Sequence, residues 1–361
     1  MSAFPFISVV IPAHGRVEPL KYTLRSAAAS IAKSGYGGEI IVVDDGSEPS
    51  IEEQLAGFDA HHPVRFVRQA NQGSIVARMT GLRGAKGKYV QFLDSDDLLH
   101  PDKIGAQLRV MEESGVDVTY TDRAQVTLGA DYSVTDFRHS RVFVDTTDSV
   151  LLFIKIIPAP HSPIYRRDYL ERALAKPVVS PRRVMDPSGD VWLLRNLAPH
   201  PATVRRVPGL YAGLGPHEEE RFTGCWEKLA LGSLAIDEAL AAKLERSQHN
   251  DKVLRRLSEI AYRSWRTLPH DMNREFQDRL LAVWRQAPEL DRAELGERGF
   301  QLLAGIIGWV NAGRITRRLR HKSYAECKTL PDAQEFAQLL AGLPVPDAIS
   351  VNLAKRPTSK P

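Results

Sequence analysis

An acidic cluster, Asp94-Ser95-Asp96-Asp97, places three carboxylates within four residues, directly after an apolar stretch. Like charges this close together repel one another unless a cation or a hydrogen-bond network compensates them. Carboxylate oxygens suit Mg²⁺ or Mn²⁺, which commonly bind one or two carboxylates together with the phosphates of a nucleotide. We therefore predict a divalent metal site with Asp94, Asp96 and Asp97 as ligands. The alternative is an ordinary helix start, with Pro101 in the first turn.

A second acidic pair, Asp44 and Asp45, begins the sequence Asp44-Asp45-Gly46-Ser47. Asp-Gly is common in turns for backbone reasons alone, so a plain turn is one interpretation. A carboxylate at a ligand-binding edge can instead accept the imide N–H of a uracil or the N–H groups of a guanine. We predict that this pair, Asp45 above all, contributes to the recognition of a base.

The elements that must position these clusters alternate between strands and helices. Short β-branched runs predict buried strands, and apolar residues at helical spacing predict the helices between them. Continuous apolar strands separated by helices are typical of an α/β fold, a mostly parallel sheet with helices on both faces. Ligands bind at the carboxyl edge of such sheets, so both acidic clusters should face one crevice. The predicted strands are 7–11, 40–43, 64–68, 89–93 and 116–121, and the predicted helices are 17–33, 51–58, 74–85 and 101–114.

In the rest of the chain the sequence pattern changes twice. After Asp122 the pattern is irregular and rich in Pro and Arg, and from Trp226 onward helical spacing returns. We predict a first domain over 1–222, with a nucleotide half (about 5–121) and an acceptor half (about 122–222). A helical region over 223–345 and a flexible tail over 346–361 complete this division. The expected helices of that region are 226–246, 252–268, 272–286 and 292–311.

The composition, 43% hydrophobic and 25% charged over 361 residues, is that of an ordinary globular protein. Two cysteines, Cys225 and Cys327, cannot form a disulfide scaffold or a four-thiolate metal site. The sequence shows no secretory signal and no apolar run of about 18 residues, so we expect a cytoplasmic location. The net charge of +4 comes from a basic C-terminal part, which argues against nucleic acid as a partner of the whole protein.

One apolar segment near the C-terminus, Phe300–Val310, leads into a cluster of basic residues that ends at Lys322. It is too short to span a bilayer and contains Trp309, a combination typical of an interfacial anchor on anionic lipid. We predict a peripheral membrane contact through about Phe300–Lys322, on the inner face of the membrane. A buried core helix followed by a solvated basic face is the alternative.

Four motifs follow one another in the first part of the chain and cover about 100 residues. They are Ser8-Val9-Val10-Ile11-Pro12, Val42-Val43-Asp44-Asp45-Gly46-Ser47, Asn71-Gln72-Gly73 with Ala77-Arg78, and Phe92-Leu93-Asp94-Ser95-Asp96-Asp97. In this order they resemble the family 2 glycosyltransferases, which have the GT-A fold, and the resemblance extends over roughly residues 5–220. It implies an inverting transfer of a sugar from a nucleotide-diphosphate sugar, with UDP favoured over GDP, and a divalent metal on the diphosphate.

The resemblance also assigns roles. The backbone around Pro12 and Ala13 and the carboxylate of Asp45 would hold the base, and Arg78 would lie near the nucleotide. Asp94, with Ser95 beside it, would meet the ribose or the metal, while Asp96 would be the main metal ligand. The partners implied are a nucleotide-sugar donor and a saccharide or lipid-linked acceptor. Assembly of cell-surface polysaccharide or glycolipid is the expected setting.

The family's Glu-Asp motif has its nearest match at Gly189-Asp190, where Gly replaces Glu. The resemblance therefore makes Asp190 the candidate catalytic base and Asp186 its rival, because inversion needs one carboxylate to deprotonate the acceptor hydroxyl. A helix N-cap is the structural alternative for Asp190. His217 resembles a downstream histidine that touches the metal or the diphosphate in some relatives, and His161 is a weaker candidate for the acceptor site.

Two other functions stay open at this stage. A nucleotidyltransferase of similar fold would use the same acidic loop, although it would usually want a Gly-rich basic loop after the first strand. A non-catalytic sugar-nucleotide-binding protein is suggested by Gly189 and by Met79, which replaces the usual Asn beside Arg78. Neither a dinucleotide-binding glycine motif nor a P-loop motif occurs.

Overall fold

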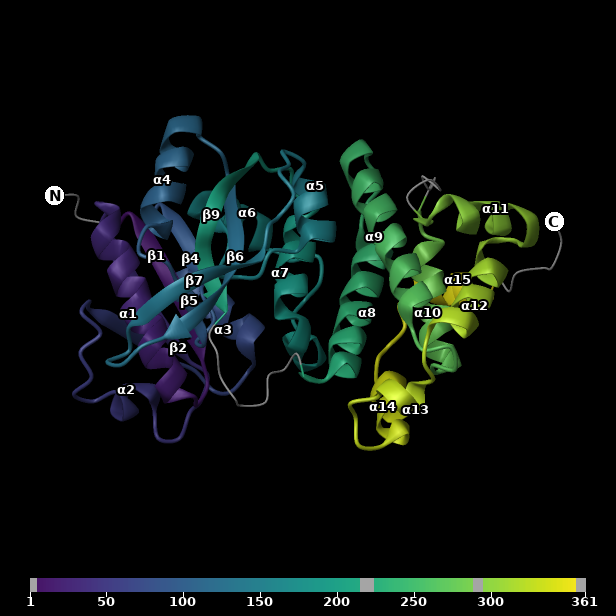
Figure 1. Ribbon diagram of the computed structural model, residues 1–361, viewed down its shortest axis with the longest axis horizontal. Coiled ribbons are helices and arrows are strands. Elements are labelled where there is room, and N and C mark those ends of the chain that lie inside the picture. The colour runs from purple at the N-terminus through teal and green to yellow at the C-terminus, as the bar shows by residue number, and fades with distance from the viewer. Residues whose placement is uncertain (1–4, 215–223, 288–294, 355–361) are drawn as a thin grey trace. The chain divides into compact units, whose positions relative to one another are not determined.

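The computed structural model describes residues 5–214, 224–287 and 295–354 (Figure 1). The chain divides into two compact units, one formed by Met1–Pro177 and His200–Glu219 and the other by Val178–Pro199 and Glu220–Pro361. Residues 178–199, which the sequence grouped with the first domain, thus belong to the second unit. The expected boundary at 222 stays a prediction, since residues 215–223 lie outside the described ranges.

The first unit is built on a single nine-stranded sheet with the strand order β3-β2-β1-β4-β8-β6-β9-β5, and β7 pairs with β6. The four strands β3, β2, β1 and β4 run parallel to one another, as predicted, whereas β4 and β8 pair antiparallel. The strands are β1 (Ile7–Ala13), β2 (Gly38–Asp44), β3 (Val64–Arg68), β4 (Tyr89–Phe92), β5 (Asp97–Leu99), β6 (Val118–Leu128), β7 (Val134–Arg141), β8 (Ile164–Arg166) and β9 (Val204–Leu214).

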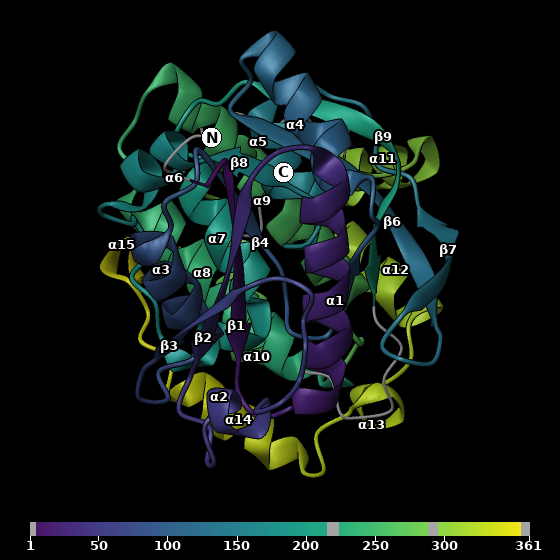
Figure 2. The same ribbon diagram turned by 90° about the vertical axis from the view of Figure 1, so that its left-hand side faces the viewer.

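Helices cover both faces of the parallel part of this sheet. In β1, Val9 belongs to the cluster that packs against Leu20 and Leu24 of α1, whereas Val10 meets α3 at Gly81. Figure 2 shows α1 and α3 on opposite sides of β1 and β2. The helices of this unit are α1 (Val17–Ser34), α2 (Ile51–Gln54), α3 (Ser74–Gly84), α4 (Lys103–Ser114), α5 (Ser149–Leu151) and α6 (Arg167–Leu174), with a π-helical turn at Leu152–Ile156.

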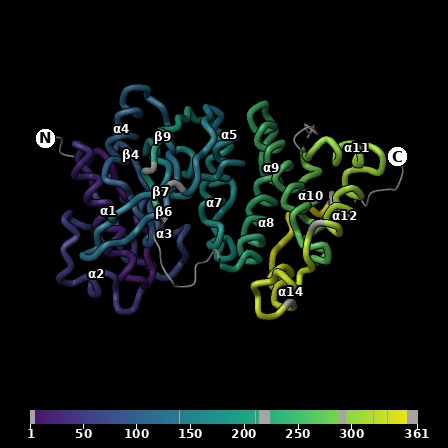
Figure 3. The backbone as a smooth tube through the Cα atoms, viewed as in Figure 1, coloured from purple at the N-terminus to yellow at the C-terminus, as the bar shows by residue number. Residues whose placement is uncertain are grey.

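The second unit is helical, as predicted, and its backbone can be followed in Figure 3. Buried ion pairs join its helices: Arg195 Nε lies 2.9 Å from Asp237 Oδ1, and Arg279 Nη2 lies 2.6 Å from Glu238 Oε2. Its elements are a 3₁₀ helix (Arg183–Ser188), α7 (Gly189–Leu197), α8 (Trp226–Lys243), α9 (Gln248–Thr267), α10 (Arg274–Trp284), α11 (Arg298–Ile307), α12 (Trp309–Arg320), α13 (Tyr324–Cys327), α14 (Ala333–Ala341) and α15 (Asp347–Ala354).

Two expectations about the elements were wrong. The helix expected over 292–311 is instead two helices, α11 and α12, because Gly308 has a φ of 83° and ends the first of them. The region after Asp122 was expected to be irregular, yet β6 continues to Leu128 and pairs with β7 as an antiparallel ribbon. Within the described ranges no helix is long and apolar enough to cross a membrane.

Candidate active site

The carboxyl ends of β1 and β2 bring the first predicted residues together. In the parallel register Pro12 lies opposite Val43 and Ala13 opposite Asp44. The backbone N–H of Asp45 then donates to the carbonyl of Ala13 over 2.9 Å. Since both strands end here, this hydrogen bond places the chain around Ala13 beside the acidic turn, at the sheet edge where ligands of parallel sheets bind.

Asp44 is committed to the turn that it begins. Its Oδ1 accepts the backbone N–H of Ser47 over 2.9 Å, and its Oδ2 accepts that of Ile51 over 3.0 Å. Only 2% of Asp44 is exposed. The side chain therefore fixes the start of α2 and the path of the loop.

Asp45 joins this turn to the loop before α3. Its Oδ1 accepts from the side-chain amide of Gln69 and from the backbone N–H of Gln72, each over 2.8 Å, and its Oδ2 accepts from Gly73 N–H over 2.8 Å. The approach is so close that a Cβ on Gly46 would lie 2.8 Å from the backbone nitrogen of Asn71. The sequence suggested a role for Asp45 in base recognition but did not reveal this support of the neighbouring loop.

Arg78 and Asp94 form the second contact of the site. Nη2 of Arg78 donates to Oδ1 of Asp94 over 2.5 Å, and Arg78 is buried. The helix that carries Arg78 packs tightly on the sheet, because Gly81, one turn further along α3, leaves room for Val10 of β1. Arg78 is thus held at the end of β4, where the acidic cluster begins.

Arg16 and Asp96 form the third contact. Both Gly15 and Arg16 have left-handed backbone angles, with φ of 60° and 51°, and the N–H of Gly15 donates to Ser47 Oγ over 2.9 Å. This bent loop brings Arg16 Nη1 to 3.5 Å from Asp96 Oδ2. This ion pair was not predicted; the available signal in the sequence was a glycine followed by a basic residue directly before a helix.

Asp97 differs from the other members of the acidic cluster because it points into the core. Its Oδ2 forms a short hydrogen bond with Nδ1 of His161, and both side chains are buried. His161 was predicted, as a weaker candidate, to line the acceptor site, and the structure gives it this internal partner. Because the carboxylate of Asp97 already has a partner inside the fold, we do not propose it as a metal ligand.

A buried polar network supports the loop that holds His161. Lys103 Nζ donates to the side-chain oxygens of Gln91 and Gln107, each over 2.5 Å. The amide of Gln91 in turn donates to the carbonyl of Pro160 over 3.0 Å. Complete burial lowers the pKa of Lys103 well below its ordinary value, because the charged ammonium loses its hydration. This network was not predicted, since its residues are scattered over three elements.

The carboxylates of Asp94 and Asp96 fit a divalent metal ion whose other ligands come from the phosphates of a nucleotide. The side chains of Asp94 and Asp96 keep 33% and 20% of their surface exposed, against 7% for Asp97. Among residues 5–214, 224–287 and 295–354, no group of three or more His, Cys, Asp and Glu side chains could hold a metal ion. Two accessible carboxylates match the donor set of Mg²⁺ when phosphates complete its coordination.

The remaining predicted residues are Asp186, Asp190 and His217. Asp186 and Asp190 belong to the second unit, at the 3₁₀ helix and in the first turn of α7. Oδ2 of Asp186 lies 3.5 Å from Arg183 Nη1, and Oδ1 of Asp190 accepts the N–H of Val191 over 2.8 Å. The N-cap of α7 is Ser188, so Asp190 is not the cap. His217 lies outside the described residues.

A family model supports the expectation drawn from the motifs. The model for glycosyl transferase family 2 matches residues 8–174. The matched segment runs from β1 into α6, and it includes the turn at Asp45, Arg78 and the acidic cluster. Every contact of the candidate site described in the first unit therefore lies within the family match.

Curated relatives are similar over part of their length. The chain is 33% identical over 120 residues to the putative teichuronic acid biosynthesis glycosyltransferase TuaG of Bacillus subtilis, covering 32% of this chain and 46% of that protein. It is 39% identical over 97 residues to a chondroitin synthase of Escherichia coli, covering 26% and 14%. An uncharacterized glycosyltransferase of Rickettsia felis is 32% identical over 120 residues, covering 33% and 19%. The chain thus spans less than half the length of these relatives.

Solved structures share the fold. S. aureus TarS (residues 1–349, in complex with UDP-GlcNAc) superposes with a TM-score of 0.58 at 17% identity, covering 86% of this chain and 90% of that one. A mannosyltransferase from Pyrobaculum calidifontis, in complex with GDP-Man and Mn²⁺, gives a TM-score of 0.50 at 14% identity, covering 98% and 88%. These likenesses confirm the predicted GT-A-like α/β fold with its helical C-terminal region. Residues 8–174 thus form a domain that matches glycosyl transferase family 2, which supports a glycosyltransferase enzyme.

Proposed function

We propose that this protein transfers a sugar from a nucleotide-diphosphate sugar, UDP in preference to GDP, to a hydroxyl acceptor with inversion at the anomeric carbon. The observation that supports the proposal is that Asp45, the Arg78–Asp94 pair and the Arg16–Asp96 pair lie where the parallel strands β2, β4 and β1 end. One edge thus offers an acceptor for the N–H of a base and charged groups for a diphosphate.

The residues of the first unit would bind the donor. The backbone at Pro12 and Ala13 and the carboxylate of Asp45 would hold the base, with Ser95 close to the nucleotide. Asp96, together with Asp94, would hold the Mg²⁺ or Mn²⁺ ion, whose positive charge stabilises the departing diphosphate. His217 stays a further proposed contact of the metal or the diphosphate. Arg16 and Arg78 keep the two carboxylates compensated in the protein without a donor.

The reaction needs one base. The acceptor oxygen forms a bond to the anomeric carbon while the bond from that carbon to the diphosphate oxygen breaks, and a carboxylate takes the hydroxyl proton. We propose Asp190 for this role, with Asp186 as its rival. The support is its family-like sequence setting and its half-buried position in the first turn of α7. A second carboxylate acting as a nucleophile is not required, unlike in retaining glycosidases.

The proposal for the acceptor rests on the names of similar proteins. Relatives carry names in teichuronic acid biosynthesis and chondroitin synthesis. These names support a saccharide or lipid-linked acceptor and a place in the assembly of cell-surface polysaccharide or glycolipid. A cytoplasmic location of the enzyme stays a prediction.

Thermal shift measurements with UDP and GDP, each with and without Mn²⁺, test the donor site. A ligand at 100 times its dissociation constant should stabilise the fold by about 2.7 kcal/mol. We expect UDP with Mn²⁺ to give the larger shift, and Asp96→Asn to remove the part that depends on the metal. An equal response to all four conditions would contradict the proposal.

Assays of sugar release and transfer with the Asp190→Asn and Asp186→Asn variants test the base. Loss of a general base should cut turnover by about 10²–10⁴-fold while the thermal shift with the donor stays unchanged. Asp186→Asn is the matched control, and a selective loss in that variant would move the assignment to Asp186. Donor binding without sugar release to any acceptor would favour a non-catalytic binding protein.

A further inference from the structure

Four large apolar side chains stand out on the surface of the second unit. Leu302 and Ile306 of α11 are 72% and 82% exposed, and Ile315 and Leu319 of α12 are 44% and 80% exposed. Each pair has the i, i+4 spacing that puts two side chains on one side of a helix. Isolated exposed apolar residues need no explanation, but two such pairs on consecutive helices form a surface that calls for a partner.

The opposite sides of the same helices are fixed to the protein interior. Phe300 and Ala304 of α11 and Arg317 of α12 are buried. The ring of Trp309 lies 5.7 Å from that of Phe300, and its carbonyl accepts from the hydroxyl of Tyr262 over 2.8 Å. Trp309, predicted to be part of a membrane anchor, thus packs inward. Because the buried sides are occupied, the exposed pairs cannot turn inward without unpacking both helices.

A basic row runs beside the apolar pair of α12. Arg314 and Arg318 are exposed, and each directly precedes one of the apolar residues, Ile315 and Leu319. Within the part of the chain that the structure describes, neither arginine lies within ion-pair distance of a carboxylate. The exposed side of α12 therefore presents two adjacent rows, one apolar and one cationic.

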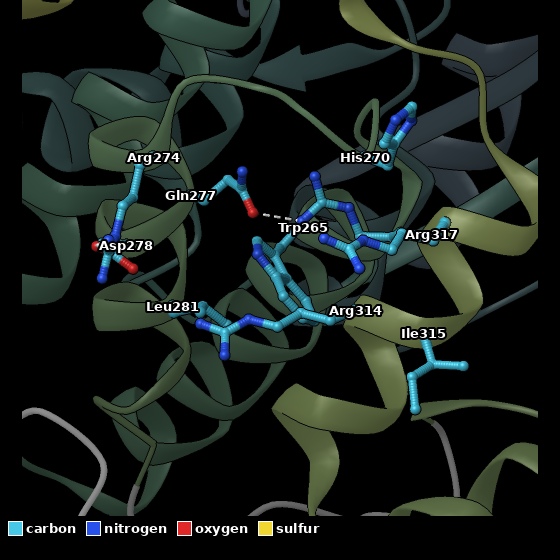
Figure 4. A pocket seen from close by; sticks show the side chains of 10 residues that line it. Trp265, His270, Arg274, Gln277, Asp278, Leu281, Arg314, Ile315 and Arg317 are labelled. Atoms are coloured by element: carbon cyan, nitrogen blue, oxygen red, sulfur yellow. Dashed lines mark hydrogen bonds and ion pairs between the residues drawn. The ribbon is translucent and has the colours of Figure 1, made fainter.

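The basic row also borders a pocket of about 390 Å³ between α9, α10 and α12 (Figure 4). Arg274, Arg314, Arg317 and Arg318 line it together with His270. The acidic residue of the lining is Asp278, whose Oδ2 lies 3.7 Å from Nε of Arg274. Among the described residues the pocket thus has a surplus of cationic groups.

Trp265 lines the pocket and is fully buried, and among the described residues its indole N–H has no hydrogen-bond partner. Arg317 donates to the carbonyl of Leu268 over 3.2 Å and to Gln277 Oε1 over 2.5 Å. Burial, and to a lesser extent the charge of Arg314, lowers the pKa of Arg317 to about 10. The indole N–H of Trp265 and the positive charge of the lining match an anion such as a phosphate.

We propose that this surface docks on a bilayer that contains anionic phospholipid. Leu302, Ile306, Ile315 and Leu319 enter the interface, and Arg314 and Arg318 hold a headgroup phosphate at the mouth of the pocket. A free phosphate or a phosphorylated small molecule would account for the pocket but not for the apolar pairs on the two helices. The combination of apolar side chains and adjacent arginines is that of interfacial helices on anionic lipid. The proposal does not depend on the proposed sugar transfer.

Vesicle flotation of the full chain tests this proposal. We expect the protein to float with vesicles of equal parts phosphatidylglycerol and phosphatidylcholine, not with phosphatidylcholine alone, and to float less at high ionic strength. Arg314→Glu/Arg318→Glu should weaken partitioning by more than about tenfold. Lys228→Glu/Lys252→Glu is the matched control, because it makes the same charge change at exposed positions of α8 and α9, and it should float nearly as well as the parent protein.

A second variant separates the apolar contribution. Leu302→Ser/Ile306→Ser/Leu319→Ser changes exposed side chains only, so its thermal midpoint should be unchanged while flotation falls. Equal flotation of the arginine variant and its control would overturn the proposal. So would stabilisation by inorganic phosphate that needs Arg314 and Arg318 without flotation of the parent protein. Dimers that dissociate in the serine variant, again without flotation, would assign the apolar surface to a second copy and overturn it as well.

Discussion

Asp97 and His161 share a short hydrogen bond in the core of the first unit, although Asp97 belongs to the same four-residue cluster as Asp94 and Asp96. The cluster is therefore divided: the carboxylates of Asp94 and Asp96 keep contact with solvent, and that of Asp97 turns inward. This arrangement relieves the mutual repulsion that the sequence implies, because the inward carboxylate has its own partner and the other two face Arg16 and Arg78.

We expect substitution of the inward carboxylate to affect stability, and substitution of a solvent-exposed carboxylate to affect metal binding. Asp97→Asn should lower the free energy of unfolding by about 1–3 kcal/mol, because its bond to His161 is weakened in a buried setting. Its thermal shift with UDP should keep its dependence on Mn²⁺. Asp96→Asn should show the reverse, with near-parental stability and loss of the metal dependence. Denaturant titration and thermal shift on both variants measure the two effects, and a loss of metal dependence in Asp97→Asn would refute the division.

Gly81→Ala should destabilise the first unit and weaken donor binding together. A Cβ at this position would lie 2.2 Å from Val10 Cγ1, so α3 must move away from β1. Overpacking of this kind typically costs about 1–3 kcal/mol, and the movement would displace Arg78 from Asp94. Gly37→Ala is the control, because a Cβ there meets nothing within 4 Å. Denaturant unfolding and the UDP thermal shift provide the two measurements; equal stability of both variants would argue against the tight contact.

The sequence predicted the parallel core because its strands follow a simple physical rule. Buried strands such as 40–43 read as unbroken β-branched runs, and the apolar face of the helix at 17–33 has clear helical spacing. The acidic motifs at the strand ends were placed correctly at one sheet edge for the same reason, since parallel strands point their carboxyl ends the same way. The break at Gly308 was missed because glycine is tolerated inside helices and its φ is not readable from composition.

Other parts of the site could not be predicted, because they depend on contacts between distant segments. The pairs Arg16–Asp96 and Asp97–His161 join residues 80 and 64 positions apart. Nothing in a local pattern states which of three neighbouring carboxylates turns inward. The bonds from Asp45 to Gln72 and Gly73 likewise arise from the register of β2 with β3 and from the path of the loop that follows.

Asp45→Asn should loosen the loop before α3. The carboxylate accepts three hydrogen bonds, and an amide can replace only one of its oxygens as an acceptor, so at least one N–H of Gln72 or Gly73 would face an N–H₂ group. We expect a loss of about 1–3 kcal/mol and faster amide exchange at residues 69–73. Glu52→Gln, on the exposed side of α2, serves as the control. Unchanged exchange in the Asp45 variant would show that the loop does not need this carboxylate.

Lys103 should make the stability of the first unit depend on pH above neutrality. Burial holds its folded-state pKa well below 10.5, the ordinary value that the unfolded chain retains. Between those two values the unfolded state binds one more proton than the folded state, so the free energy of unfolding rises with pH. The free energy of unfolding changes by at most about 1.4 kcal/mol per pH unit. The full stabilisation is present above the pKa of Lys103 in the unfolded state. It is lost as the pH falls through the pKa of Lys103 in the folded state.

The difference between the parent protein and Lys103→Met isolates this effect, because every other titrating group is common to both. Methionine keeps the length of the side chain but carries no proton, so the parent should gain stability relative to the variant as pH rises from neutral to about 10. Lys86→Met, at an exposed position, controls for the loss of one lysine. Denaturant unfolding at several pH values gives the curves. A difference that stays flat for Lys103→Met, like that for the control, would mean that the buried amine keeps its proton and that the network of Gln91 and Gln107 stabilises the ammonium fully.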